Sequence, residues 1–118
     1  MLQSSIFKTL AWPERRKEDR EEVVLRGRIV LADHKSHLDC TILNKSPSGA
    51  EIRLAHGRIL PELFFLVNAA ACTAHHAVLV WQKGALSGLY FEQTHALGAM
   101  LPPDLAFLNT HWTACAAS

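Results

Sequence analysis

Apolar and polar positions alternate with a period of two between residues 23 and 92, which is the pattern of half-buried β-strands. In the first segment one face carries Val23, Leu25, Ile29 and Leu31, and the other carries Val24, Arg26, Arg28 and Val30. Gly27 stands in the middle, where a glycine favours a bulge or a bend of the kind that closes a barrel. We therefore predict a strand over residues 23–31 that is irregular at Gly27.

The strand pattern returns in five further segments. Residues 38–42 and 50–54 alternate in the same way, and residues 63–67, 77–81 and 88–92 are apolar runs of strand length. Polar or glycine-containing turns fall at residues 32–37, 45–49 and 82–84. Strands joined by such short connections pair antiparallel, because a parallel crossover needs about a dozen residues or more. We predict a mainly β fold, a small closed barrel of six antiparallel strands.

The C-terminal tail has a different period. Pro102, Pro103 and Asp104 form a helix-start signal, since proline suits the first turn and an acidic residue there favours the helix dipole. An apolar stripe at helical spacing then follows: Leu105, Leu108, Trp112 and Cys115. The stripe predicts a helix that packs on the barrel as a lid. A dimerisation helix is the alternative, because Phe107 and Trp112 exceed what a small lid needs.

Length, composition and charge narrow the class of protein. A chain of 118 residues is enough for one domain. We divide it into an N-terminal arm (1–13), a barrel domain (14–93) and a helical tail (94–118). The 49% of hydrophobic residues exclude a disordered chain, and no apolar run is long enough to predict membrane insertion. A net charge of +1 gives no basic field for binding DNA.

Cysteine usage points to the cellular compartment. The three cysteines, Cys40, Cys72 and Cys115, stand far apart and form no CxxC pair. An odd count without such a pair argues against a disulfide framework and favours a reducing compartment. The first residues lack the basic and apolar regions of a secretory signal. We therefore expect a cytoplasmic protein.

Two segments carry groups suited to a guanine nucleotide. Arg16 and Arg20 come directly before the first predicted strand, and residues 44–49 form the turn between the second and third strands. The rim of a barrel can bring these segments together. An arginine fork binds guanine O6 and N7 or phosphate oxygens, and the Asn44 amide offers both donors and an acceptor to a base edge. No acid–base pair or nucleophile accompanies them, so we expect binding rather than catalysis.

These segments resemble the two motifs of the PilZ domain family. Residues 16–20 (RKEDR) fit the RxxxR motif, and residues 44–49 (NKSPSG) fit the D/N-x-S-x-x-G motif. Their order, their separation and the strands around them also agree with the family. Residues 80–81 and 88–91 look like the family's late strands, so the resemblance covers roughly residues 15–92.

The resemblance implies a receptor for cyclic di-GMP in bacterial signalling. By it, Arg16 and Arg20 would clasp guanine edges and phosphates, and Asn44, Ser46 and Gly49 would receive the other guanine on the barrel surface. Arg15 would accompany an intercalated ligand dimer. We therefore expect a non-enzymatic, PilZ-like protein without a metal or cofactor. Ligand-driven ordering of the RxxxR segment would change the surface offered to a downstream protein.

Other interpretations stay open from the sequence. The arginines fit a solvated, ion-paired segment, and residues 44–49 fit a plain turn. His34 and His37 could form half a metal site, whereas the adjacent His75 and His76 point to opposite faces of a strand. The main alternative function is a ligand-independent adaptor for a motility or polysaccharide machine; with either function we expect a monomer or a homodimer. Such an adaptor would depend on exposed apolar residues such as Trp112.

Overall fold

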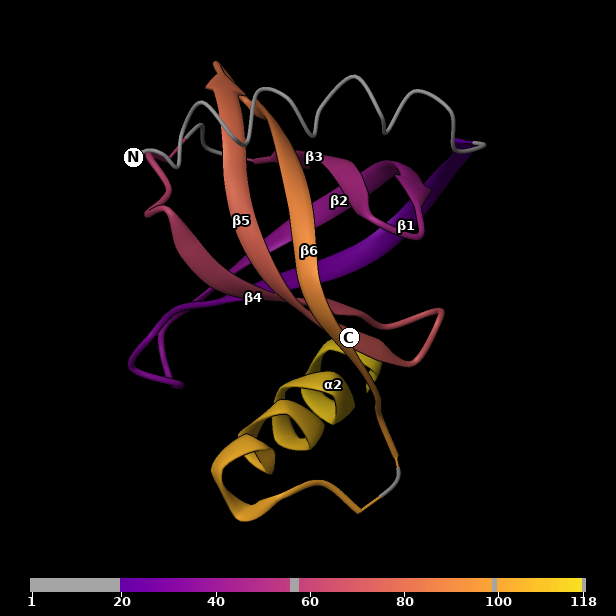
Figure 1. The fold of residues 1–118 in the computed structure, drawn as a ribbon, viewed down its shortest axis with the longest axis vertical. Coiled ribbons are helices and arrows are strands. Elements are labelled where there is room, and N and C mark those ends of the chain that lie inside the picture. Colours follow the sequence, from indigo (N-terminus) through magenta and orange to yellow (C-terminus); the bar gives the residue numbers. More distant parts are fainter. Residues whose placement is uncertain (1–19, 56–57, 99, 118) are drawn as a thin grey trace.

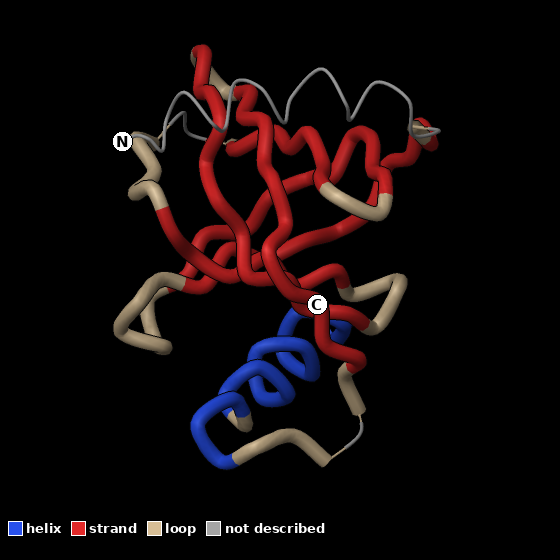
Figure 2. Tube along the Cα trace, viewed as in Figure 1, coloured by secondary structure: helices blue, strands red, loops and turns tan. Residues whose placement is uncertain are grey.

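A computed structural model describes residues 20–55, 58–98 and 100–117 of the chain. It shows a closed barrel of six antiparallel strands with one helix at the C-terminal end (Figures 1 and 2). The elements are β1 (Glu21–Val30), β2 (His37–Ser46), β3 (Gly49–Leu54), β4 (Leu63–Asn68), β5 (Thr73–Lys83), β6 (Leu86–Ala96), the 3₁₀ turn η1 (Pro103–Leu105) and α2 (Phe107–Ala117). The predicted fold class is confirmed.

The barrel closes in the order β1-β2-β3-β6-β5-β4, with β4 hydrogen-bonded to β1. Four neighbouring pairs are hairpins of consecutive strands, namely β1–β2, β2–β3, β4–β5 and β5–β6. The pair β3–β6 is not consecutive, because the chain leaves β3 and crosses to the far side of the barrel before it forms β4. As a result, the β2–β3 hairpin lies directly beside β6.

The predicted alternation of β1 is confirmed, and both of its faces find partners. Ile29 is 0% exposed and belongs to the core inside the barrel. Val30 points the other way and is also 0% exposed, because it packs with Leu108 of α2 in a second apolar cluster. Further from the helix, Val24 on that outer face is 82% exposed. The outer face of β1 is therefore buried only where α2 covers it.

The prediction of an irregularity at Gly27 was wrong. Gly27 pairs regularly with Cys40 on β2 and Asn68 on β4, and the register shift in β1 falls between Glu22 and Leu25. A Cβ atom at position 27 would lie 3.1 Å from the Cys40 Sγ atom and 3.2 Å from the Ile42 Cδ1 atom. Gly27 thus makes room for side chains of β2 inside the barrel instead of breaking the strand.

Several strand limits also differ from the prediction. The turn placed at residues 45–49 is shorter, because β2 continues through Ser46 and β3 begins at Gly49. The last two strands are longer than the apolar runs at 77–81 and 88–92. They extend to Thr73 and Ala96, where polar residues such as His75 and Thr94 pair across β5 and β6. Pairing of the backbone, which does not require apolar side chains, continues the hairpin beyond the apolar runs.

Helix α2 packs on the outer faces of β1 and β4, on the side of the molecule opposite the turn of the β5–β6 hairpin (Figure 1). It begins at Phe107, after the 3₁₀ turn at the predicted start signal. Leu108 and Cys115 of the predicted stripe are buried, and the Trp112 indole N–H donates to the Ala69 carbonyl oxygen over 3.3 Å. The prediction of a helix that packs on the barrel is confirmed. Among the described residues, no helix has the length and apolar character needed to cross a membrane.

Candidate functional site

The β2–β3 hairpin carries three of the six predicted binding residues. Pro47 and Ser48 form its turn, and Ser46 pairs with Gly49 across it. The Phe91 N–H on β6 donates to the Ser48 carbonyl oxygen over 2.8 Å, which ties the tip of the hairpin to the neighbouring strand. The segment predicted as a turn is therefore held firmly within the sheet.

Asn44 stands at the centre of a chain of side-chain hydrogen bonds across three strands. Asn44 on β2 pairs with Glu22 on β1 and with Glu51 on β3. Its Oδ1 atom accepts from the Arg20 guanidinium, and its Nδ2 atom donates to the Glu51 carboxylate over 2.7 Å. Antiparallel pairing of β1 with β2 thus joins Arg20 and Asn44, which belong to the two separate motifs.

A small hollow of about 230 Å³ lies at this hydrogen-bonded chain. Its lining comes from four strands and the residue before β1: Arg20, Asn44, Ala50, Glu51, Trp81 and Gly88. Trp81 on β5 is paired with Gly88 on β6. A Cβ atom on Gly88 would lie 2.1 Å from the Trp81 Nε1 atom, so the indole occupies the space that a larger residue would need.

The hollow combines side chains of the kinds that occur in nucleotide-binding sites. A guanidinium presents five N–H donors in a rigid fork, and a tryptophan ring offers a flat face for stacking a base. Both polar ends of the Asn44 amide already have partners. Each end keeps capacity for one more hydrogen bond, because an amide has two N–H donors and two lone pairs on its oxygen. The Glu51 carboxylate adds a negative charge to the site.

The remaining predicted residues are placed differently. Ser46 and Gly49 do not line this hollow. The Ser46 Oγ atom is buried and has no hydrogen-bond partner among the described residues, and Gly49 is buried in pairing with Tyr90. Arg15 and Arg16 lie outside the described residues. The structure thus joins Arg20 and Asn44 and leaves Ser46 and Gly49 behind them in the hairpin.

Four lining residues were not predicted as site residues: Ala50, Glu51, Trp81 and Gly88. The sequence holds a signal for two of them. Gly84 has a positive φ of 59° and begins a tight turn after Lys83, which pairs with Leu86. Counting outward from that turn pairs Trp81 with Gly88. Their position beside Asn44 could not be found in this way, because it depends on the non-consecutive pairing of β3 with β6.

The histidines considered for half a metal site contact rings of α2. The His34 ring stacks on Phe107 with centroids 3.8 Å apart, and the His37 ring lies 5.5 Å from that of His111. Within the described ranges, no three His, Cys, Asp or Glu side chains gather closely enough to hold a metal ion.

A scan against protein-family models found no match, and a search of curated proteins found no similar sequence.

Proposed function

We propose that this protein is a non-catalytic, PilZ-like receptor for cyclic di-GMP. The observation that carries the proposal is the meeting of Arg20 and Asn44, one from each motif, at a hollow lined by Trp81. The closed six-stranded barrel is the fold that the resemblance to PilZ domains implies, and it supports the same proposal. Neither the resemblance nor the barrel alone would specify the position of the ligand.

In the proposed complex, Arg20, Trp81 and Asn44 each contact a different part of the ligand. The Arg20 guanidinium binds a guanine edge or a phosphate oxygen of the ligand. The Trp81 ring stacks on a base, and stacking of this kind contributes about 1–3 kcal/mol for each base. The Asn44 amide binds a base edge through its second N–H and the second lone pair of its oxygen. Arg15, Arg16, Ser46 and Gly49 remain proposed ligand contacts.

Ligand binding would also change the surface of the protein. Arg20 stands at the entry to β1, so new bonds to its guanidinium alter the contacts of the segment that carries Arg15 and Arg16. We infer that a downstream protein binds the ligand-bound and ligand-free surfaces differently. Such a mechanism needs only that the partner binds the two states of the surface with different affinities.

Isothermal titration with cyclic di-GMP tests the proposal on the full chain. Loss of one bidentate arginine contact costs about 1–3 kcal/mol, so Arg20→Ala should weaken binding by about tenfold to a hundredfold. Lys35→Ala is the matched control, since it also removes one positive charge but lies in the turn at the other end of β2. Equal affinities for wild type and Arg20→Ala would contradict the assignment of this hollow.

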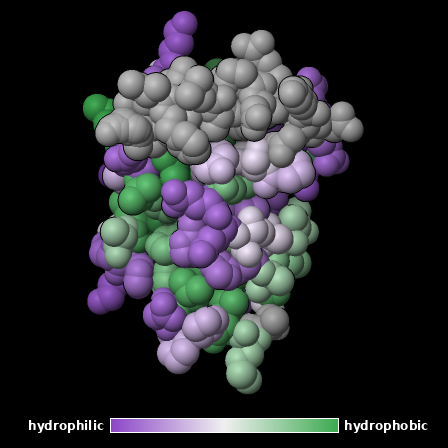
Figure 3. Space-filling model, viewed as in Figure 1, coloured by the Kyte–Doolittle hydropathy of each residue, from purple (hydrophilic) through white to green (hydrophobic). Residues whose placement is uncertain are grey.

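Exposed apolar side chains favour the adaptor as the second candidate function. Figure 3 shows hydrophobic residues beside hydrophilic ones on one face of the barrel. Ile59 and Leu63, at the entry to β4, are 92% and 58% exposed. Trp112, the contact expected from the sequence, is only half-exposed and packs on the barrel. An adaptor would keep its partner when Arg20 is replaced and lose it when Ile59 and Leu63 become polar.

A further inference from the structure

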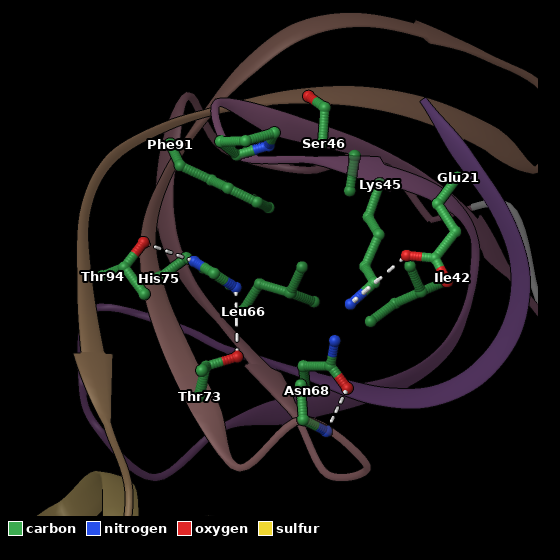
Figure 4. Close-up of a pocket in the computed structure, with 13 residues that line it drawn as sticks. Glu21, Ile42, Lys45, Ser46, Leu66, Asn68, Thr73, His75, Phe91 and Thr94 are labelled. Atoms are coloured by element: carbon green, nitrogen blue, oxygen red, sulfur yellow. Dashed lines mark hydrogen bonds and ion pairs between the residues drawn. The ribbon is translucent and has the colours of Figure 1, made fainter. Parts of the chain in front are cut away.

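A second and larger hollow opens at the end of the barrel, on the inner side of the β2–β3 hairpin (Figure 4). Its volume is about 480 Å³, within the range of roughly 300–1,000 Å³ that small-molecule sites occupy. Its lining comes from β1, β2, β3, β4, β5 and β6 and from the loop after β4. Of the residues in the first hollow, it shares only Ala50.

The floor and one wall of this hollow are apolar. Ile42 and Leu66 are fully buried beneath it. The Phe91 ring forms a wall and stacks on the His75 imidazole, with centroids 3.8 Å apart and planes inclined by 7°. Figure 4 shows these side chains around an open centre. The hollow therefore offers flat and aliphatic surface to the body of a ligand.

Two hydrogen-bond donors converge on the open centre. Asn68 is only 3% exposed, and its Oδ1 atom accepts from the Ala71 N–H over 3.1 Å. This bond fixes the amide so that its Nδ2 atom faces the hollow, where it has no hydrogen-bond partner among the described residues (Figure 4). The Lys45 ammonium points to the same part of the hollow. Its carboxylate partner, Glu21, is 4.0 Å away, and the Glu21 side chain is 69% exposed.

The charged groups around the hollow favour a ligand with a single negative charge. Lys45 and Glu21 are the only oppositely charged pair among the described lining residues. The remaining titratable group is His75, whose ring nitrogens lie 2.8 Å from the Thr94 hydroxyl and 3.3 Å from the Thr73 hydroxyl. Burial, and after it the charge of Lys45, lowers the pKa of His75 to about 4, so this wall is neutral at pH 7. A dianion would find one cation and an opposing carboxylate.

We propose that this hollow binds a small monocarboxylic acid with an apolar body. The carboxylate bridges the Lys45 ammonium and the Asn68 Nδ2 atom, in place of the distant and exposed Glu21. The body lies on Leu66 and Phe91. Hydrogen bonds to a charged group are about twice as strong as neutral ones, so a carboxylate held there gains from both donors at once.

Matched probes test the proposal by two-dimensional NMR on the full chain. 3-Phenylpropionate supplies the carboxylate and an aromatic body, and 3-phenylpropionamide is its uncharged counterpart. We expect the acid to shift the signals of the lining residues and to bind at least about tenfold more tightly than the amide. Lys45→Met should remove that difference. Lys35→Met, which changes an exposed lysine of the β1–β2 turn, should preserve it.

Asn68→Asp provides a second variant of nearly the same shape. It keeps an oxygen for the Ala71 N–H but replaces the donor with a negative charge, so acid binding should be lost. Three results would overturn the proposal: no shifts in the lining residues at about 10 mM acid, equal binding of acid and amide, or normal acid binding by folded Lys45→Met. Comparing the affinities of the wild-type protein for the acid and the amide tests the proposal even where a variant does not fold.

This site is separate from the hollow at Arg20, although Ser46, a proposed contact of the nucleotide, is one of its lining residues. Arg20→Ala should leave binding of 3-phenylpropionate unchanged, because Arg20 does not line the hollow. A protein that fails to bind cyclic di-GMP but binds the acid would contradict the proposed function and support this inference.

Discussion

Replacing Leu108 with alanine tests whether α2 is an integral part of the fold or a detachable element that a partner can take up. Leu108 of α2 is 0% exposed, and it packs on the outer faces of β1 and β4, against Val30 and Val67. Buried Leu→Ala replacements cost about 2–5 kcal/mol. Only one helix covers this small cluster and can settle into part of the cavity, so we expect about 3 kcal/mol.

Urea unfolding followed by circular dichroism measures this loss. Domains of this kind have a free energy of unfolding of about 5–15 kcal/mol, so the change is large, and it corresponds to a fall in Tm of roughly 10 °C. The control is Leu63→Ala, at a leucine that is 58% exposed, where we expect a loss below about 1 kcal/mol.

Equal unfolding midpoints for the two variants would refute this reasoning, because Leu108 would then contribute no more than an exposed leucine. The slope of the free energy against urea separates two further cases. An unchanged slope with a lower midpoint means that helix and barrel unfold together, whereas a smaller slope means that α2 has already left the native state. The second result would make the apolar face of α2 a surface for partners.

Three further predictions concern protonation, reactivity and the aromatic wall of the site. An NMR titration should give a pKa of about 4 for His75, because burial opposes protonation of its ring. An unfolded histidine titrates near pH 6.5, so the free energy of unfolding should fall by roughly 3 kcal/mol as the pH drops from about 6.5 to about 4. A titration midpoint above pH 6 for His75 would contradict this prediction. Burial raises the pKa of the Cys40 thiol to about 12, so iodoacetamide should label the exposed Cys72 of the native protein and spare Cys40; equal labelling would be the contrary result. Gly88→Ala should push the indole of Trp81 out of its place, which a shifted fluorescence maximum would report in a protein whose other tryptophans are replaced with phenylalanine; an unchanged spectrum would contradict the close approach.

The sequence predicted the barrel because alternation is a local signal. Ile42 and Ile52 alternate with polar neighbours, and both prove fully buried inside the barrel. The burial of Val30 on the opposite face of β1 was not predictable in this way, since it depends on α2 folding back from the other end of the chain. The limits of β5 and β6 were also missed, because polar residues continue the pairing.

Some residues of the candidate site were likewise predictable from local sequence, and others depended on the fold. Motif spacing selected Arg20 and Asn44, which the structure joins by a hydrogen bond. Glu51 and Trp81 enter the same hollow only through the arrangement of four strands around the barrel. Motif membership also did not predict that the Ser46 hydroxyl would be buried with no hydrogen-bond partner in the described part of the chain.

One NMR titration with cyclic di-GMP tests the proposed receptor, because it measures affinity and location together. We predict binding at micromolar or lower concentration, with the largest shifts at the Asn44 side-chain amide and the Trp81 indole N–H. Because these groups line one hollow, they should follow the same binding curve. A folded protein that shows no shifts, or shifts that leave Asn44 and Trp81 unchanged, would contradict the account.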